Sequence, residues 1–193
     1  MTYVFDTSSL STLKHFYPNI FKSVWVGLDA LIQQQQLIST REVWNEIVRG
    51  VPTLHVNDWL NDRKDVFTTP SPTVSVQTPP PLERVYRHDS MCYHQTPPDS
   101  AGGSERLRPT ELQFVATIFQ NPHFHGLISK KQLLRGDPVA DPFVIACAKV
   151  RGGTVVTEER LNPNGARIPN VCEHFNVSCI NLEKFMDQQK WSF

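Results

Sequence analysis

The stretch that decides the fold is Tyr3-Val4-Phe5-Asp6-Thr7-Ser8-Ser9. Three consecutive apolar residues are typical of a short buried strand, and the Thr-Ser-Ser run is typical of a helix start. Asp6 is therefore expected directly after a strand and beside a helix N-terminus. In open α/β sheets, the crevice beyond the carboxyl ends of the strands is where ligands bind. A carboxylate next to hydroxyl groups in that crevice indicates a metal or phosphate site.

Short apolar runs and helical periodicity alternate along the rest of the chain. Strands are expected at residues 2–5, 37–38, 154–157 and 177–180. Helices are expected at 8–16, 20–35, between the 39–40 cap and 50, at 55–63, from 110 onward, at 141–152, 168–175 and 182–188. Strands that alternate with helices predict an α/β fold with a parallel sheet and right-handed crossovers.

A proline-rich stretch interrupts this pattern. The chain has 193 residues, which fits one domain, or one domain with an insertion. Many of its 15 prolines fall between Pro70 and Pro109, and residues 68–72 are expected to resist regular structure. We interpret residues 78–108 as a partly disordered insertion in a single domain that spans 1–193.

Composition narrows the class of protein. Nineteen basic residues balance nineteen acidic ones, so any contact with nucleic acid has to use local patches. Four cysteines are too few and too scattered for a disulfide framework. No apolar run approaches the roughly 20 residues that span a bilayer, and no signal peptide is visible. We therefore expect a cytoplasmic protein without a membrane association.

Four further acids occupy positions like that of Asp6. Glu46 lies on the helix after the second expected strand, and Asp141 begins a strongly apolar helix, where we expect it to be the N-cap. Glu158 and Glu159 directly follow the third expected strand. Because strand C-termini and the following helix N-termini share one edge of a parallel sheet, these acids are expected to converge, with Glu46 reaching over from its helix.

Clustered carboxylates need a counter-charge, because they repel and raise one another's pKa. No Lys or Arg flanks Asp6 or Asp141 at helical spacing, so a divalent cation is the natural candidate. Mg²⁺ and Mn²⁺ favour oxygen ligands, and one or two such ions assist in-line attack on a phosphodiester. The residues thus predict metal-dependent hydrolysis of phosphoesters.

Each acid also has a purely structural explanation. Asp6 could cap the first helix, and Glu46 alone could be an exposed helix residue. Asp141 before Pro142 is a common helix start, with proline at the first helical position. The two adjacent glutamates alone could form a surface turn. The functional hypothesis therefore rests on all these positions taken together.

The order and spacing of the motifs resemble those of PIN-domain (PilT N-terminus) nucleases. Residues 4–8 resemble that family's apolar strand ending in Asp-Thr-Asn or Asp-Thr-Ser, and residues 38–50 resemble its strand, spacer and Glu-Leu-x-x-Gly. Residues 141–148 resemble its Asp-x-x-Ile-Ala-Ala-x-Ala helix, and residues 155–159 its closing Val-Thr-x-Asp. The motifs span residues 3–159, and the tail resembles a bacterial branch of PIN-like proteins.

The resemblance implies a three-layer α/β/α sandwich that depends on Mg²⁺ or Mn²⁺ and cleaves single-stranded RNA. It assigns the catalytic, metal-binding acids to Asp6, Glu46, Asp141 and Glu159, with Glu158 as the alternative fourth acid. Ser8, where many members have Asn, and Thr157 are expected to contact the substrate. Glu159 departs from the family's usual Asp by one methylene.

The resemblance also suggests a biological role. Many bacterial PIN proteins are toxins of toxin–antitoxin pairs, often dimeric, and are neutralised by a small partner protein. We therefore expect an endoribonuclease toxin with an antitoxin partner and a possible homodimer. The alternative is a PIN-like scaffold without activity that binds RNA or a protein.

Overall fold

The computed structural model of this chain describes residues 1–49, 54–68, 110–129 and 134–191. The strands are β1 (Tyr3–Phe5), β2 (Leu37–Thr40), β3 (Phe67–Thr68), β4 (Thr154–Val156) and β5 (Ser178–Ile180). The α-helices are α1 (Thr7–Thr12), α2 (Lys22–Gln33), α3 (Arg41–Arg49), α4 (Leu54–Asn61), α5 (Glu111–Phe119), α7 (Asp141–Arg151), α8 (Ile168–His174) and α9 (Leu182–Gln188). Short 3₁₀ helices lie at Leu13–His15, Lys64–Val66 and Pro122–Leu127.

The five strands form one sheet in the order β3-β2-β1-β4-β5, and every pairing is parallel. The first strand of the chain is the central one, because Tyr3 pairs with Leu37 on one side and with Thr154 on the other. The predicted α/β fold with a parallel sheet is confirmed. The strand order reverses direction between β1 and β4, which makes their carboxyl ends the topological switch point of the sheet.

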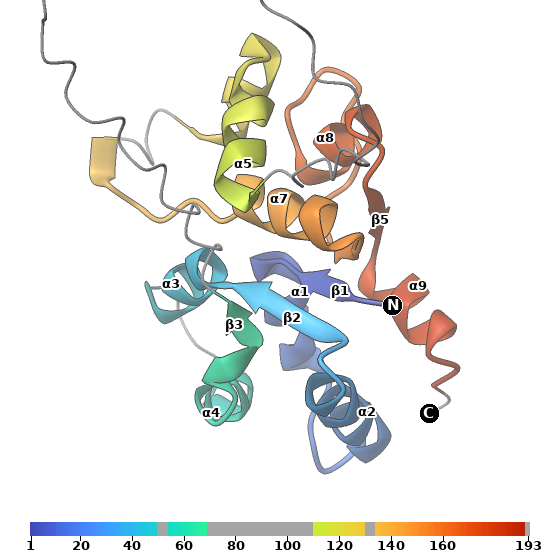
Figure 1. The fold of residues 1–193 in the computed structure, drawn as a ribbon. Coiled ribbons are helices and arrows are strands. Elements are labelled where there is room, and N and C mark those ends of the chain that lie inside the picture. Colours follow the sequence, from blue (N-terminus) through green and yellow to red (C-terminus); the bar gives the residue numbers. More distant parts are fainter. Residues whose placement is uncertain (50–53, 69–109, 130–133, 192–193) are drawn as a thin grey trace, which may run out of the picture.

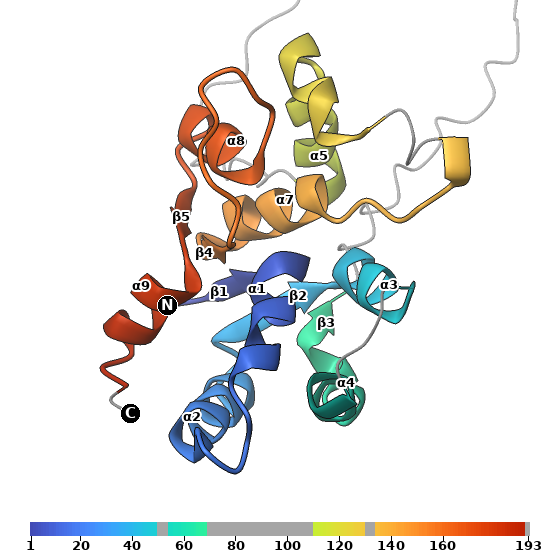
Figure 2. The same cartoon turned by 180° about the vertical axis from the view of Figure 1, so that it is seen from behind.

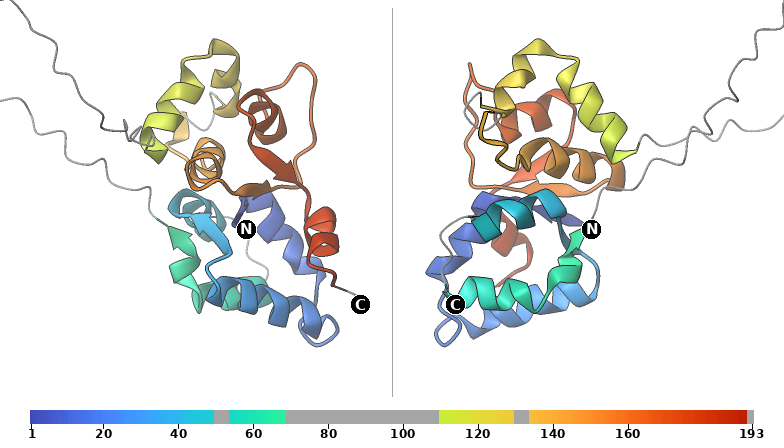
Figure 3. Two further views of the ribbon diagram at one scale, coloured as in Figure 1. Left: turned by 45° about the vertical axis from the view of Figure 1, so that its right-hand side comes forward. Right: turned by 90° about the vertical axis from the view of Figure 1, so that its left-hand side faces the viewer.

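Helices cover both faces of this sheet (Figures 1 and 2). Helices α5, α7 and α8 lie on one side, and α1, α2, α4 and α9 lie on the other, as the side views in Figure 3 show. Right-handed crossovers explain the division, because the chain first winds outward from β1 to β3 and later winds the opposite way from β4 to β5. The three-layer α/β/α sandwich is therefore confirmed.

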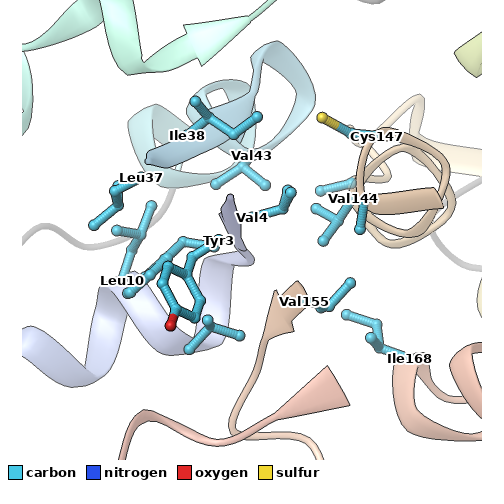
Figure 4. Close-up of a cluster of buried hydrophobic side chains, with 14 of the residues drawn as sticks. Tyr3, Val4, Leu10, Leu37, Ile38, Val43, Val144, Cys147, Val155 and Ile168 are labelled. Carbon is cyan, nitrogen blue, oxygen red and sulfur yellow. The ribbon is translucent and has the colours of Figure 1, made fainter. Parts of the chain in front are cut away.

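The core is centred on β1 and on the apolar helix α7. Val4 of β1 is fully buried and lies among side chains from β2, α3, α7 and β4 (Figure 4). Residues 144–148 of α7 are buried without exception, so this helix has almost no solvent face there. On the opposite side, the ring of Phe185 on α9 packs edge-on against Tyr3 and Phe5, with centroids 4.9 and 5.0 Å away. Both ends of the described chain thus contribute to one core.

Strand β3 corrects one expectation. Residues 68–72 were expected to be irregular, yet Thr68 closes β3 and pairs with Thr40 of β2. A two-residue edge strand is too short to produce an alternating pattern, and the prolines that follow it hide the signal.

The predicted insertion at 78–108 lies outside the described residues, and the single-domain division stays a prediction. The helix expected from residue 110 is present as α5, which Thr110 and Gln113 begin with a reciprocal capping box. None of the helices in the described ranges is long and apolar enough to cross a membrane.

Candidate active site

Asp6 lies at the carboxyl end of β1 and is only 3% exposed. Its Oδ1 accepts a hydrogen bond from the Ser9 amide at 2.7 Å, so Asp6 does cap α1. Its Oδ2 accepts from the Thr157 hydroxyl at 2.7 Å and from the Ser8 hydroxyl at 2.9 Å. The capping explanation and the site hypothesis are therefore compatible, because capping involves only one of the two carboxylate oxygens.

Ser8 and Thr157 tie the end of β4 to the end of β1. The Thr157 hydroxyl accepts from the Glu159 amide at 3.0 Å, and the Ser8 hydroxyl accepts from the Glu158 amide at 2.9 Å. Each hydroxyl thus fixes both Asp6 and the backbone of the loop after β4. Both residues were expected to contact substrate. The structure places them as residues that position Asp6, and substrate contact stays a prediction.

Glu46 reaches the same edge from the middle of α3. Its Oε1 accepts from the Ala140 amide at 2.8 Å, and its Oε2 accepts a short hydrogen bond from the Thr7 hydroxyl. Burial raises the pKa of Glu46, and the nearby charge of Asp6 raises it further, against the opposing effect of the two hydrogen bonds. The expected approach of Glu46 to the sheet edge is therefore present.

Asp141 is the first residue of α7 and not its N-cap, so that prediction is wrong. The N-cap is Ala140, whose backbone is already helical and whose carbonyl accepts from the Val144 amide at 3.0 Å. The Glu46 carboxylate accepts the hydrogen bond of the Ala140 amide. Helix α7 therefore begins at Asp141, one residue earlier than it would if Asp141 were the N-cap. In the described part of the chain, the Asp141 carboxylate accepts a hydrogen bond from its own backbone amide and from no other residue.

The charges of the other three acids act on the Asp141 carboxyl group. Its pKa is raised from 3.8 to about 7, first by burial and then by the charges of Glu159, Glu46 and Asp6, in that order. Four acids from four parts of the chain therefore share one electrostatic environment at the switch point of the sheet. A carboxyl whose pKa is perturbed by burial and by neighbouring charges is typical of functional sites.

Glu158 and Glu159 point to different helices. The Glu159 carboxylate accepts from the Ile168 amide at the start of α8, at 2.9 Å, and faces Arg167 at 3.9 Å. The Glu158 carboxylate accepts from the Leu182 amide at the start of α9, at 2.7 Å. The structure thus brings Glu159 into the acid group and places the Glu158 carboxylate at the start of α9.

The donor chemistry of the group fits a hard divalent cation. All four carboxylates present oxygen, the ligand that Mg²⁺ and Mn²⁺ prefer. Within the described ranges, Arg167 is the one cation paired with any of the four, and the pKa of Asp141 stays raised by burial and by the charges of the other three acids. In the same ranges, no three His, Cys, Asp or Glu side chains are already arranged to hold one ion.

Two residues that contact the acids were not predicted from the sequence. Thr7 stands inside the first motif, but nothing local indicates that its hydroxyl would bind Glu46, 39 residues later. Arg167 stands before α8 in an irregular segment, and no periodicity singles it out as the partner of Glu159.

Fold and site together define a doubly wound parallel α/β structure with a group of acids at its switch point. The chain belongs to the family described as a domain of unknown function (DUF4411), which matches residues 3–95 and 108–193. The match includes all five strands and all the acids discussed above. No curated protein and no solved structure matches the chain.

Proposed function

We propose that this chain is a Mg²⁺- or Mn²⁺-dependent endoribonuclease that hydrolyses RNA phosphodiesters. One observation carries the proposal: the buried Asp141 carboxylate, which is not the N-cap of α7, lies near the charges of Glu159, Glu46 and Asp6, which raise its pKa. Asp141 lies in the first turn of α7 and accepts a hydrogen bond from its own backbone amide, yet its pKa stays raised to about 7. Its repulsion with the neighbouring acids would be relieved by positive charge.

The four acids have different tasks in this proposal. Asp6 is held rigidly by the Ser9 amide and two hydroxyls, and Glu46 fixes the start of α7 through the Ala140 amide. Asp141 and Glu159 complete the set of oxygens that would hold the cation. A bound divalent ion would supply the positive charge and Lewis acidity that phosphodiester hydrolysis requires.

Cleavage of a labelled single-stranded RNA with added Mn²⁺ or Mg²⁺ tests the proposal. Asp6→Asn and Asp141→Asn should each lower the rate by more than about 100-fold, beyond the 10–100-fold typical of groups that only orient metal ligands. Glu158→Gln is the matched control, because its carboxylate lies at the start of α9. Full activity in Asp141→Asn would contradict the proposal.

One observation favours the alternative of an inactive scaffold. Both oxygens of Asp6 and both of Glu46 already accept internal hydrogen bonds, which competes with metal binding. A scaffold of this kind would bind RNA or a protein without cleaving it. Isothermal titration calorimetry with Mn²⁺ distinguishes the nuclease from the inactive scaffold. The scaffold predicts no binding heat that is present in the wild type and lost in Asp141→Asn.

The resemblance to PIN-domain toxins extends the proposal to a toxin–antitoxin pair. Expression of the wild-type chain should then arrest bacterial growth, and expression of Asp141→Asn to the same level should not. Co-expression with the product of the adjacent gene should restore growth if that product is the antitoxin. Sedimentation of the purified chain tests the homodimer.

A further inference from the structure

A cavity of about 340 Å³ adjoins the acid group, and Thr157 and Glu159 line it. The Thr157 hydroxyl donates to Asp6 at 2.7 Å, and Glu159 is one of the four acids. The volume lies near the lower end of the roughly 300–1,000 Å³ that is typical of small-molecule sites. The cavity therefore suits one small group of a substrate whose reacting part lies at the acids.

The register of the sheet explains why the cavity lies at this edge. Val156 of β4 is opposite Ile180 of β5, and the Thr157 amide donates to the Ile180 carbonyl at 2.9 Å. Asn181 follows Ile180 directly and lines the cavity, so it lies at the carboxyl end of β5. A ligand in the cavity would thus lie between the ends of β4 and β5, next to the acid group.

The walls of the cavity are mostly apolar. They are formed by Leu161, Pro169, Val177, Cys179 and Ile180. Leu161 is 54% exposed, so a ligand that covers it would remove apolar surface from water. An unstacked RNA base has two apolar faces and a polar edge, the combination that a cavity with apolar walls and few polar groups accepts.

Two polar side chains that line the cavity can bind the edge of a base. The Glu173 carboxylate, on α8, has no hydrogen bond and no ion pair within the described part of the chain. The Asn181 Oδ1 accepts from the Lys184 amide at 3.0 Å, which orients its Nδ2 group as a donor. The cavity therefore offers one charged acceptor and one neutral donor.

We propose that this cavity binds guanine, in the nucleotide next to the phosphate that is cleaved. Guanine is the RNA base with two adjacent N–H donors, N1–H and N2–H, which match the two oxygens of the Glu173 carboxylate. Asn181 donates to an acceptor of the same nucleotide. The placement of the phosphate rests on the proposed function, whereas recognition of the base does not.

Nuclear magnetic resonance of isotope-labelled protein, titrated with guanosine in EDTA, tests the base site without metal, phosphate or cleavage. Guanosine should shift the side-chain amide signal of Asn181. The variant Asn181→Asp identifies that signal by its loss and keeps an oxygen that can cap α9. Inosine, which lacks the 2-amino group, and adenosine should each bind at least about fivefold more weakly than guanosine. Equal binding of the three nucleosides, or no shift with guanosine, would overturn the proposal.

The variant Glu173→Gln tests the acceptor. It should bind guanosine about 10-fold more weakly and lose the preference over inosine, because glutamine carries no charge and has one acceptor oxygen instead of two. Glu183→Gln is the matched control, since Glu183 is exposed on α9 and does not line this cavity. An undiminished preference for guanosine in Glu173→Gln would contradict the assignment.

An RNA with a single guanosine among adenosines connects the base site to the proposed nuclease. With Mn²⁺, the wild type should cut next to the guanosine, and Glu173→Gln should lose this selectivity. A protein that binds guanosine but cuts no RNA contradicts only the proposed nuclease. A protein that cuts RNA without regard to the guanosine contradicts only the base site.

Discussion

Replacing Asp141 by asparagine should stabilise the metal-free protein at neutral and alkaline pH. The pKa of Asp141 is raised from 3.8 to about 7, mainly by burial and by the charges of Glu159, Glu46 and Asp6. The folded state therefore binds this proton more tightly than the unfolded state does. Stability falls as the pH rises from about 3.8 towards 7, and the full penalty is present above the folded-state pKa.

The size of the penalty follows from the same pKa. At about 1.4 kcal/mol for each tenfold change in proton affinity, the shift corresponds to at most about 4 kcal/mol above pH 7. Asparagine has nearly the volume of aspartate and carries no charge. The stability difference between the variant and the wild type should therefore grow by about 2–3 kcal/mol between pH 5 and pH 8.

Urea denaturation followed by circular dichroism, at pH 5 and pH 8 with EDTA, measures this difference. Asp58→Asn is the matched control, because Asp58 is exposed on α4 and its replacement should leave the pH profile unchanged. Equal stability differences for Asp141→Asn at the two pH values would refute the reasoning. The acids would then not share a common electrostatic environment in the folded protein.

Three further predictions concern metal binding, the hydroxyl that holds Asp6, and the residue that ends α7. Mn²⁺ at 100 times its dissociation constant should stabilise the wild type by about 2.7 kcal/mol in a thermal melt, and Asp141→Asn should show little of this gain. Thr157→Val removes a buried donor to Asp6 and should cost about 1–3 kcal/mol in urea denaturation. The control Thr154→Val should cost nothing, since that hydroxyl is buried without a hydrogen-bond partner. Gly152→Ala should cost about 1 kcal/mol by the same measurement, because this residue ends α7 with φ +63°.

The sequence predicts the sheet well where strands are buried on both faces. Residues 3–5 and 154–156 are uninterrupted apolar or β-branched runs, because helices cover both sides of the central strands. Edge strand β3 has only two residues and no such run, so its pairing with β2 depends on contacts that local sequence does not encode. Helix α2 was predictable from its spacing, because Val24, Leu28 and Leu31 lie on one buried face.

The site was predictable only to the level of which acids follow which elements. The start of α7 depends on Glu46, which lies 94 residues before the amide it binds, and no local rule predicts that. Which of the two adjacent glutamates joins the acid group is likewise decided by later helices. The Leu182 amide of α9 binds the Glu158 carboxylate, and the Ile168 amide of α8 binds the Glu159 carboxylate. Local capping statistics therefore assigned Asp141 the wrong structural role, as the N-cap of α7.

The position of β1 in the middle of the sheet has a consequence for biosynthesis. The ribosome releases β1, β2 and β3 first, yet the second edge of β1 pairs only with Thr154 and its neighbours in β4. Until then, the most apolar strand has an open edge, the kind of surface that chaperones protect and that aggregates form on. The acid group includes both Asp6 and Glu159, so it assembles only after residue 159 has been translated. Under the proposed function, a nascent chain would therefore be unable to cleave the RNA from which it is being made until then.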